Sequence, residues 1–353
     1  MKVTFVSPPA NLGGGTRVIA IYAQQLREQG HEVTVVSPAH QEKRSLSTFF
    51  LRPRSDPQPP SHFDGTQITM RIVEGKMSVS DDDVPDADIV IATWWETAEW
   101  VNALSKRKGS KVYFVQHHEV FSYLPVERVR DTYRMPLHKI VIAKWLADVM
   151  RDDYGDNTAD IVPNSVDLSQ FYAPPREKRP RPTVGVLYGS SYWKRFPLAI
   201  EVLRRVHERL PELQVFCFGS ESMPSLPSFA SYTRSPPQDS LRDIYASCDV
   251  WLTTSSSEGF NLPAMEAMAC RTPVVATRTG WPAEAVVDGV NGACVAVDDV
   301  DGLARETERL LCLTPAEWRC LSDGAFETVC ESSWGRSAAL FASVLSRVVD
   351  RQM

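Results

Sequence analysis

The sequence lacks several features that would assign it to other classes of protein. Its apolar runs fall short of the roughly 18 residues that a membrane-spanning helix needs. Residues 2–7 are typical of a β-strand rather than of a signal peptide. The seven cysteines form no C-x-x-C pair, which favours reduced thiols over disulfides or zinc. Reduced thiols indicate a cytoplasmic protein. The net charge of −6 argues against a nucleic-acid partner.

What the sequence does contain is a regular alternation of strand and helix patterns. Residues 3–7 are apolar and strand-like, and residues 17–29 carry a helical stripe of apolar side chains that ends at Gly30. Similar pairs of patterns recur along the chain. Strands that alternate with helices predict a parallel, doubly wound α/β sheet.

The length of 353 residues suggests two domains rather than one core. A stretch rich in proline and charge, residues 171–182, predicts a linker. We therefore expect an N-terminal domain over 1–170 and a second domain over 183–334. Residues 41–66, with four prolines and little periodicity, predict a loop.

The most informative stretch, residues 255–277, follows an apolar strand pattern at 250–254. It continues as Glu258-Gly-Phe-Asn-Leu-Pro263, and proline suits the first position of a helix. The backbone amides of residues 259–262 would then lie at a helix N-terminus. That position favours an anion such as phosphate.

Two carboxylates flank this helix start. Glu258 precedes the turn, and Glu266 is expected on the first helical turn. Carboxylates so placed would accept hydrogen bonds from hydroxyl groups on either side of a bound diphosphate, which is the pattern of a sugar nucleotide. The alternative interpretation is a buried strand–loop–helix in which the two glutamates occur by chance.

This stretch resembles the hallmark of the large retaining glycosyltransferase family with the two-domain GT-B fold (family 4-like, group 1). The hallmark is two glutamates separated by seven residues. Here E-G-F-N-L-P starts at Glu258, E-A-M-A at Glu266 and P-V-V at Pro273. The resemblance implies two Rossmann-like domains that face a cleft. The helix expected at 335–353 resembles the family's last helix, which packs back on the first domain.

The resemblance also implies roles for residues of the second domain. Glu258 would be a catalytic residue that binds the donor sugar, and Glu266 would bind the ribose. The donor diphosphate would contact four residues of the turn: Gly259, Phe260, Asn261 and Leu262.

Lys194 matches the family lysine that stabilises the departing diphosphate, and is therefore a candidate catalytic residue. The family's usual arginine is missing near Ser190. Arg195 is the candidate donor-binding replacement.

The same resemblance places two features of the first domain near the donor: a pair of glycines and a histidine. Gly14 and Gly15 would let the backbone approach the diphosphate in dihedral angles that other residues avoid. A dinucleotide site is the rival interpretation, but it needs an acidic residue where the chain has Ser37-Pro38. The family often has a histidine near the transferred sugar. Of His117 and His118, we favour His118 as the catalytic residue.

Charged clusters elsewhere are given structural interpretations. Asp81-Asp82-Asp83 is superficially similar to a metal-binding D-x-D motif but lies in a polar loop, and 117–119 offers too few ligands. We expect no metal. Basic residues at 106–108 and 128–139 predict a charged face, with peripheral contact to an anionic membrane at its inner face as the alternative.

Together these features predict a metal-independent, retaining glycosyltransferase. It would move a hexose-type sugar from a nucleotide diphosphate sugar to a hydroxyl acceptor, which the sequence leaves open as a glycan, a lipid-linked molecule or a small molecule. No cofactor beyond the donor substrate and no protein partner is implied. The alternative is a noncatalytic sugar-nucleotide-binding homologue, supported by the missing arginine near Ser190.

Overall fold

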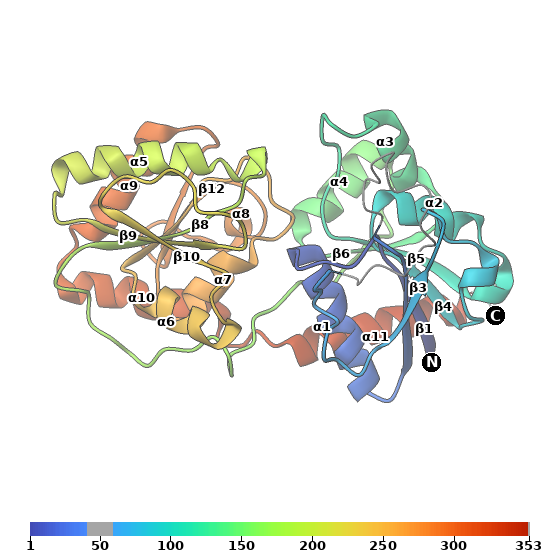
Figure 1. The fold of residues 1–353 in the computed structure, drawn as a ribbon. Helices are drawn as coiled ribbons and strands as arrows, with labels where there is room; N and C mark the ends of the chain where they lie inside the picture. Colours follow the sequence, from blue (N-terminus) through green and yellow to red (C-terminus); the bar gives the residue numbers. More distant parts are fainter. Residues whose placement is uncertain (41–58, 352–353) are drawn as a thin grey trace. The chain divides into compact units, whose positions relative to one another are not determined.

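The computed structural model describes residues 1–40 and 59–351 and divides the chain into two compact units (Figure 1). Unit 1 comprises Met1–Pro163 and the chain from Trp334 onward, and unit 2 comprises Asn164–Ser333. Of the loop expected at 41–66, residues 41–58 lie outside the described residues, and residues 59–66 lie mainly in turns.

Unit 1 holds, within its described residues, a seven-stranded parallel sheet in the order β3-β2-β1-β4-β5-β6-β7. The central strands are buried on both faces, as the apolar run Ile89–Ala92 shows. The strands are β1 (Lys2–Val6), β2 (Glu32–Pro38), β3 (Thr69–Val73), β4 (Ile89–Ala92), β5 (Ser110–Val115), β6 (His138–Val141) and β7 (Asp160–Ile161). The helices are α1 (Gly14–Glu28), α2 (Trp95–Ala103), α3 (Val126–Arg134), α4 (Lys144–Tyr154) and α11 (Trp334–Asp350).

The last helix, α11, completes the core of unit 1 beside α1 (Figure 1). Its Phe341 is fully buried, and its ring centroid lies 4.8 Å from that of Tyr22 and 5.2 Å from that of Phe114. Because α1 and α11 are more than 300 residues apart in sequence, this contact closes unit 1 around the two ends of the chain.

Unit 2, which is described throughout, holds a six-stranded parallel sheet in the order β10-β9-β8-β11-β12-β13. The strands are β8 (Thr183–Leu187), β9 (Gln214–Gly219), β10 (Ala230–Arg234), β11 (Val250–Thr253), β12 (Val274–Thr277) and β13 (Gly292–Val295). The helices are α5 (Phe196–Arg209), α6 (Leu241–Ala246), α7 (Leu262–Ala269), α8 (Pro282–Ala285), α9 (Val300–Leu311) and α10 (Pro315–Val329). The predicted α/β class with two Rossmann-like sheets is confirmed.

Residues 171–182, expected to form a linker, belong to unit 2 and are fastened to it. The Arg176 guanidinium donates to Thr272 Oγ1 at 2.9 Å and lies 4.6 Å above the Trp318 ring. The buried Asp249 carboxylate accepts hydrogen bonds from the amides of Arg179 and Thr183. Proline and charge prevent regular secondary structure here, but these contacts hold the segment in place, so unit 2 begins at Asn164.

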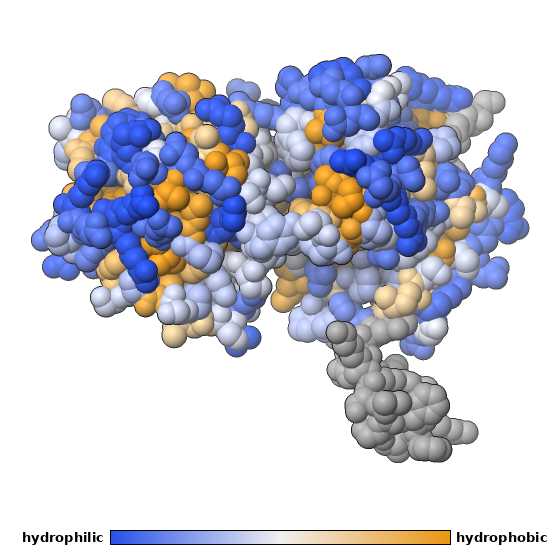
Figure 2. Space-filling model, turned by 90° about the horizontal axis from the view of Figure 1, so that it is seen from above, coloured by the Kyte–Doolittle hydropathy of each residue, from blue (hydrophilic) through white to orange (hydrophobic). Residues whose placement is uncertain are grey.

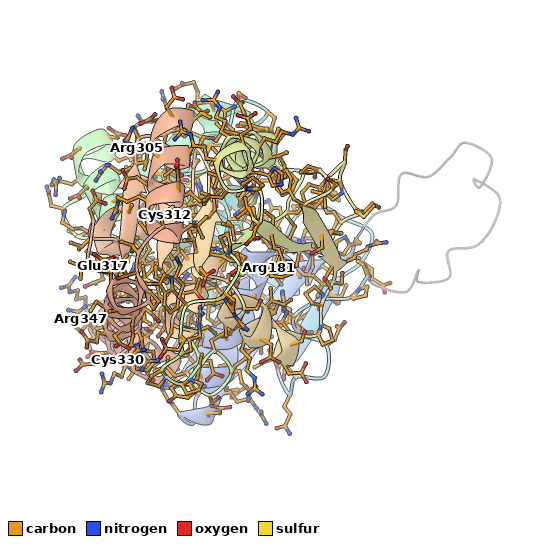
Figure 3. All side chains as sticks on the ribbon, turned by 90° about the vertical axis from the view of Figure 1, so that its left-hand side faces the viewer. Arg181, Arg305, Cys312, Glu317, Cys330 and Arg347 are labelled. Atoms are coloured by element: carbon orange, nitrogen blue, oxygen red, sulfur yellow. The ribbon has the colours of Figure 1, made fainter. Side chains whose placement is uncertain are left out.

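All seven cysteines are free thiols, and all lie in unit 2. Burial raises the pKa of Cys217 and of Cys248 to about 12, so both are inert core side chains. Cys312 lies at the end of α9 and Cys330 at the end of α10 (Figure 3).

The surface carries no helix that would cross a bilayer, as far as residues 1–40 and 59–351 extend. In the view of Figure 2, hydrophilic residues separate the apolar patches from one another. Single exposed apolar side chains such as Met223, Tyr123 and Met77 are normal for a folded protein.

The buried aromatic contact of α11 predicts the effect of removing the Phe341 ring. Phe341→Ala should lower the unfolding free energy of unit 1 by about 3–5 kcal/mol, since it removes a fully buried ring and leaves a cavity. Leu340→Ala, at a neighbouring side chain that is 43% exposed, is the control and should change it by less than about 0.5 kcal/mol. Denaturant unfolding measures both, and equal midpoints would contradict the packing of α11 described above.

Candidate functional site

The strand–turn–helix expected at residues 250–269 is present in unit 2. Helix α7 begins at Leu262, so Pro263 is its second residue rather than its first. Asn261 is the N-cap in a left-handed conformation (φ 80°), and its Nδ2 donates to Thr253 Oγ1 at 2.9 Å. The amides of Phe260, Asn261 and Leu262 make no hydrogen bond to a protein atom in the described part of the chain. They remain donors for a ligand at the helix N-terminus.

Lys194 and Glu258, 64 residues apart in sequence, form an ion pair beside this helix start. The distance from Lys194 Nζ to Glu258 Oε1 is 2.7 Å, and the glutamate side chain is only 9% exposed. Ser255 Oγ donates to the same carboxylate oxygen at 2.6 Å. The structure therefore brings together two of the predicted catalytic residues, and adds a serine that sequence reasoning missed.

A pocket lies at the carboxyl ends of β8 and β11. Lys194 and Glu258 line it together with Asn261, Pro263 and the strand ends. In parallel sheets with helices on both faces, ligands bind at this edge. The pocket therefore combines a cation, a carboxylate and the N-terminus of α7.

Glu266 lies elsewhere than expected. It is the fifth residue of α7, beyond the first turn, and is only 3% exposed. Its Oε2 accepts a hydrogen bond from the buried Tyr245 hydroxyl at 2.7 Å. This contact joins Glu266 to α6, and the side chain is not among the residues that line the pocket.

Arg195 does not join the pocket in this structure. Its backbone is left-handed (φ 53°), and its guanidinium lies 2.7 Å from the carboxylate of Asp298. The Ser190 amide, where the family arginine is missing, donates to Glu221 Oε1 at 2.9 Å. Lys194 is thus the cation that the loop after β8 supplies to the pocket.

In unit 1, Gly14 and Gly15 open α1 directly after the loop that follows β1. Neither glycine has a positive φ, so the expectation of dihedral angles that other residues avoid was wrong. A Cβ added at Gly14 would meet no described atom within 4 Å. The described part of the protein therefore leaves room for a side chain at this position.

His118 is turned towards two tyrosines of unit 1. Its Nε2 lies 2.6 Å from the Tyr154 hydroxyl, and its ring packs against Tyr133. Burial lowers the pKa of His118 to about 4, so the imidazole is neutral at pH 7. His117 packs against Phe121 and Trp145 instead, so the two neighbouring rings have different surroundings.

Glu119 is a buried residue whose role the sequence did not indicate. Its Oε2 accepts a hydrogen bond from the Trp95 amide, the first of α2, at 3.0 Å. Its own amide donates to the Tyr133 hydroxyl at 2.9 Å. Desolvation raises the pKa of Glu119 well above its usual range. An acidic residue four positions after a buried strand was the only signal available for this cap.

Residues 1–40 and 59–351 contain no group of three or more His, Cys, Asp or Glu side chains that could hold a metal ion. Asp81–Asp83 form a short 3₁₀ turn, where Asp83 accepts from Ser80 and pairs with Lys76 at 2.6 Å. Asp81 accepts a hydrogen bond from the Ser105 amide. These acidic residues hold the turn together.

The basic residues of α3 are paired with acidic neighbours. Arg128 binds Glu99 through two hydrogen bonds of 2.6 Å, and the other two pairs are Arg130–Glu127 and Arg134–Asp131. This pairing favours the charged-face interpretation over a patch that attracts anionic lipid.

Two family models match the chain. Residues 12–170 match the model described as Glycosyltransferase Family 4, and residues 182–312 match the model described as Glycosyl transferases group 1. The second match contains the loop of Lys194 and the whole strand–turn–helix with both glutamates. Together the two matches span most of the chain.

Two curated relatives are similar to parts of the chain. The D-inositol 3-phosphate glycosyltransferase 2 of Catenulispora acidiphila is 39% identical over 113 residues, which are 32% of this chain and 26% of that protein. The D-inositol 3-phosphate glycosyltransferase of Mycolicibacterium smegmatis is 34% identical over 161 residues, 41% of this chain and 36% of that protein. The matched part thus spans about a quarter to a third of the length of these relatives.

Among solved structures, HepE of Anabaena in complex with UDP and glucose has a similar fold. The TM-score is 0.76 at 16% sequence identity, and the match covers 98% of this chain and 100% of that one. The likeness confirms the predicted GT-B architecture. With this fold, and with two family models that span most of its length, the chain belongs to the family 4-like, group 1 glycosyltransferases that these models describe.

Proposed function

We propose that this protein is a metal-independent, retaining glycosyltransferase. It moves a hexose-type sugar from a nucleotide diphosphate sugar to a hydroxyl acceptor. The observation that carries the proposal is the Lys194–Glu258 ion pair, which lies in one pocket with the N-terminus of α7. Retention of the anomeric configuration rests on the family resemblance.

In this proposal the diphosphate binds at the N-terminus of α7. The amides of Phe260, Asn261 and Leu262 are available as donors, and Gly259, in the preceding turn, would lie beside the same phosphates. Lys194 moves to the departing diphosphate, where its positive charge stabilises the negative charge that develops in the transition state. Because the helix and the lysine supply this charge, no divalent cation is required.

The two glutamates bind the two ends of the donor. Glu258, at the pocket, accepts hydrogen bonds from hydroxyl groups of the transferred sugar. Glu266 binds the ribose, with its orientation fixed by the Tyr245 hydroxyl. Arg195 contributes to donor binding only if it leaves Asp298, so we assign it a smaller role than Lys194.

Unit 1 supplies the acceptor side. Gly14 and Gly15 allow a ligand to approach the start of α1, and Gln116 Nε2 donates to the Gly15 carbonyl at 3.3 Å. His118 is the proposed histidine near the transferred sugar. Because its pKa is lowered to about 4, it acts there as a neutral hydrogen-bonding group rather than as a cation.

The relatives indicate which substrates to test first. The curated relatives are named for D-inositol 3-phosphate, and the HepE structure holds UDP and glucose. UDP-sugars and phosphorylated cyclitols are therefore the first donors and acceptors to test. The buried free thiols fit a reducing compartment such as the cytoplasm.

A noncatalytic sugar-nucleotide-binding homologue is the second candidate. The observation in its favour is the loop after β8, where Ser190 replaces the family arginine and its amide binds Glu221. Such a protein would bind the donor without transferring the sugar.

Nucleotide binding and metal dependence test the proposal directly. Thermal unfolding with UDP, GDP and dTDP should show stabilisation by one of them, about 2.7 kcal/mol at a hundred times its dissociation constant. Transfer from the corresponding nucleotide sugar should persist in excess EDTA, because the pocket supplies its own positive charge. Binding without transfer to any acceptor would favour the noncatalytic candidate. Activity that EDTA abolishes and manganese restores would contradict metal independence.

Gly14→Ala separates ligand approach from folding. The added methyl group meets no described atom within 4 Å, so the free energy of unfolding should stay constant or rise, by up to about 1 kcal/mol. Sugar transfer should fall by about tenfold or more, since one clash of 1.4 kcal/mol already has that effect. Gly30→Ala is the control with the opposite result: its φ of 88° makes alanine destabilising, and activity should persist. Full activity of Gly14→Ala would rule out a ligand at this glycine.

A further inference from the structure

Glu258 Oε1 accepts two hydrogen bonds in this structure, and they come from different segments. Lys194 Nζ donates at 2.7 Å from the loop after β8, and Ser255 Oγ donates at 2.6 Å from the end of β11. Ser255 is 2% exposed and Glu258 is 8% exposed. Both bonds are short and charge-assisted, and they hold one oxygen of a largely buried carboxylate.

The two bonds have different fates if the donor binds as proposed. Lys194 would turn to the diphosphate, which would remove its charge from Glu258. A buried carboxylate that loses a partner is costly unless other donors satisfy it. The bond from Ser255 does not depend on Lys194 and would persist, so Glu258 would keep its position while the sugar hydroxyls bind.

Ser255 is itself fixed by the neighbouring strand. Its carbonyl accepts a hydrogen bond from the Thr277 hydroxyl, at the end of β12, at 2.5 Å. The Thr279 hydroxyl lies 3.5 Å from the same carbonyl. The backbone of Ser255 is therefore held by residues at and just after the end of β12, independently of Lys194.

Thr254 fixes the turn that carries Lys194. Its hydroxyl lies 3.3 Å from the Lys194 carbonyl and 3.1 Å from the Arg195 carbonyl. The Ser256 amide donates to the Trp193 carbonyl at 2.7 Å, so residues 193–195 are bound along their length to 254–256. Arg195 is left-handed there (φ 53°), a conformation that is uncommon for residues other than glycine.

We propose that Ser255 and Thr254 are positioning residues of the donor site. Ser255 holds Glu258 in place for the transferred sugar when Lys194 moves to the leaving diphosphate, and Thr254 holds the backbone that presents Lys194. The inference rests on the proposed function, which it deepens by assigning these two hydroxyl groups to the transfer step.

Four variants and two readouts test the proposal. Ser255→Ala and Thr254→Val each remove one hydroxyl, and Thr254→Ser restores one. Ser322→Ala is the matched control. Ser322 lies in α10, outside the pocket; it is also buried (1% exposed), and its hydroxyl donates to the Arg271 carbonyl. The readouts are kcat and KM for sugar transfer, and the dissociation constant of the nucleoside diphosphate without its sugar.

Ser255→Ala and Thr254→Val should each lower kcat by about tenfold, the effect of losing one buried hydrogen bond to a charged or constrained group. Ser255→Ala should leave the affinity for the sugar-free nucleoside diphosphate within about twofold, because Glu258 contacts the sugar. Thr254→Ser should recover most of the lost kcat. Ser322→Ala should keep the kcat of the wild-type protein. If the losses in the other variants came from a general loss of packing in unit 2, Ser322→Ala would lower kcat as well.

The inference would be overturned if the wild-type protein transfers sugar and Ser255→Ala lowers kcat no more than Ser322→Ala does. The proposed function would then remain intact. Equal losses for Thr254→Val and Thr254→Ser would overturn the assignment of Thr254. Wild-type protein that binds no nucleoside diphosphate would instead overturn the proposed function together with the inference.

Discussion

The Glu258 carboxylate lies at the carboxyl edge of a parallel sheet with less than a tenth of its side chain exposed, and a charge in such a place must be paired. Lys194 and Ser255 meet this requirement from two different segments. The rest of the pocket holds these two partners in place. The turn of Lys194 is hydrogen-bonded to residues 254–256, and Ser255 is hydrogen-bonded to the end of β12. The site is thus organised around one buried charge.

In unit 1, the loop that follows β5 and carries His118 is held in place by hydrogen bonds. Tyr133 contacts the backbone on both sides of His118, and Glu119 caps α2. Burial raises the pKa of the Glu119 carboxyl well above its usual range and lowers the pKa of His118 to about 4, so it disfavours the charged form of both groups. Burial therefore disfavours charge in this loop, whereas the pocket of unit 2 holds an ion pair.

Much of the fold could be predicted from the sequence, because strand and helix periodicity is local and the stretch around Glu258 and Glu266 is distinctive. The contacts that sequence reasoning could not predict join distant segments of the chain. Arg195 is drawn to Asp298, and residues 171–182 are fastened by Arg176 to unit 2. The contribution of Ser255 could not be predicted either, since nothing in a run of three serines says which hydroxyl reaches the carboxylate.

The most direct test of the account is the Lys194 Nζ to Glu258 Oε1 distance in a crystal structure with a bound nucleotide diphosphate sugar. The account predicts that the distance of 2.7 Å lengthens beyond hydrogen-bonding range. Lys194 should contact the diphosphate at the N-terminus of α7, and Glu258 should keep its bond to Ser255 and bind the sugar. An intact ion pair, with the donor bound elsewhere in the protein, would contradict the central claim.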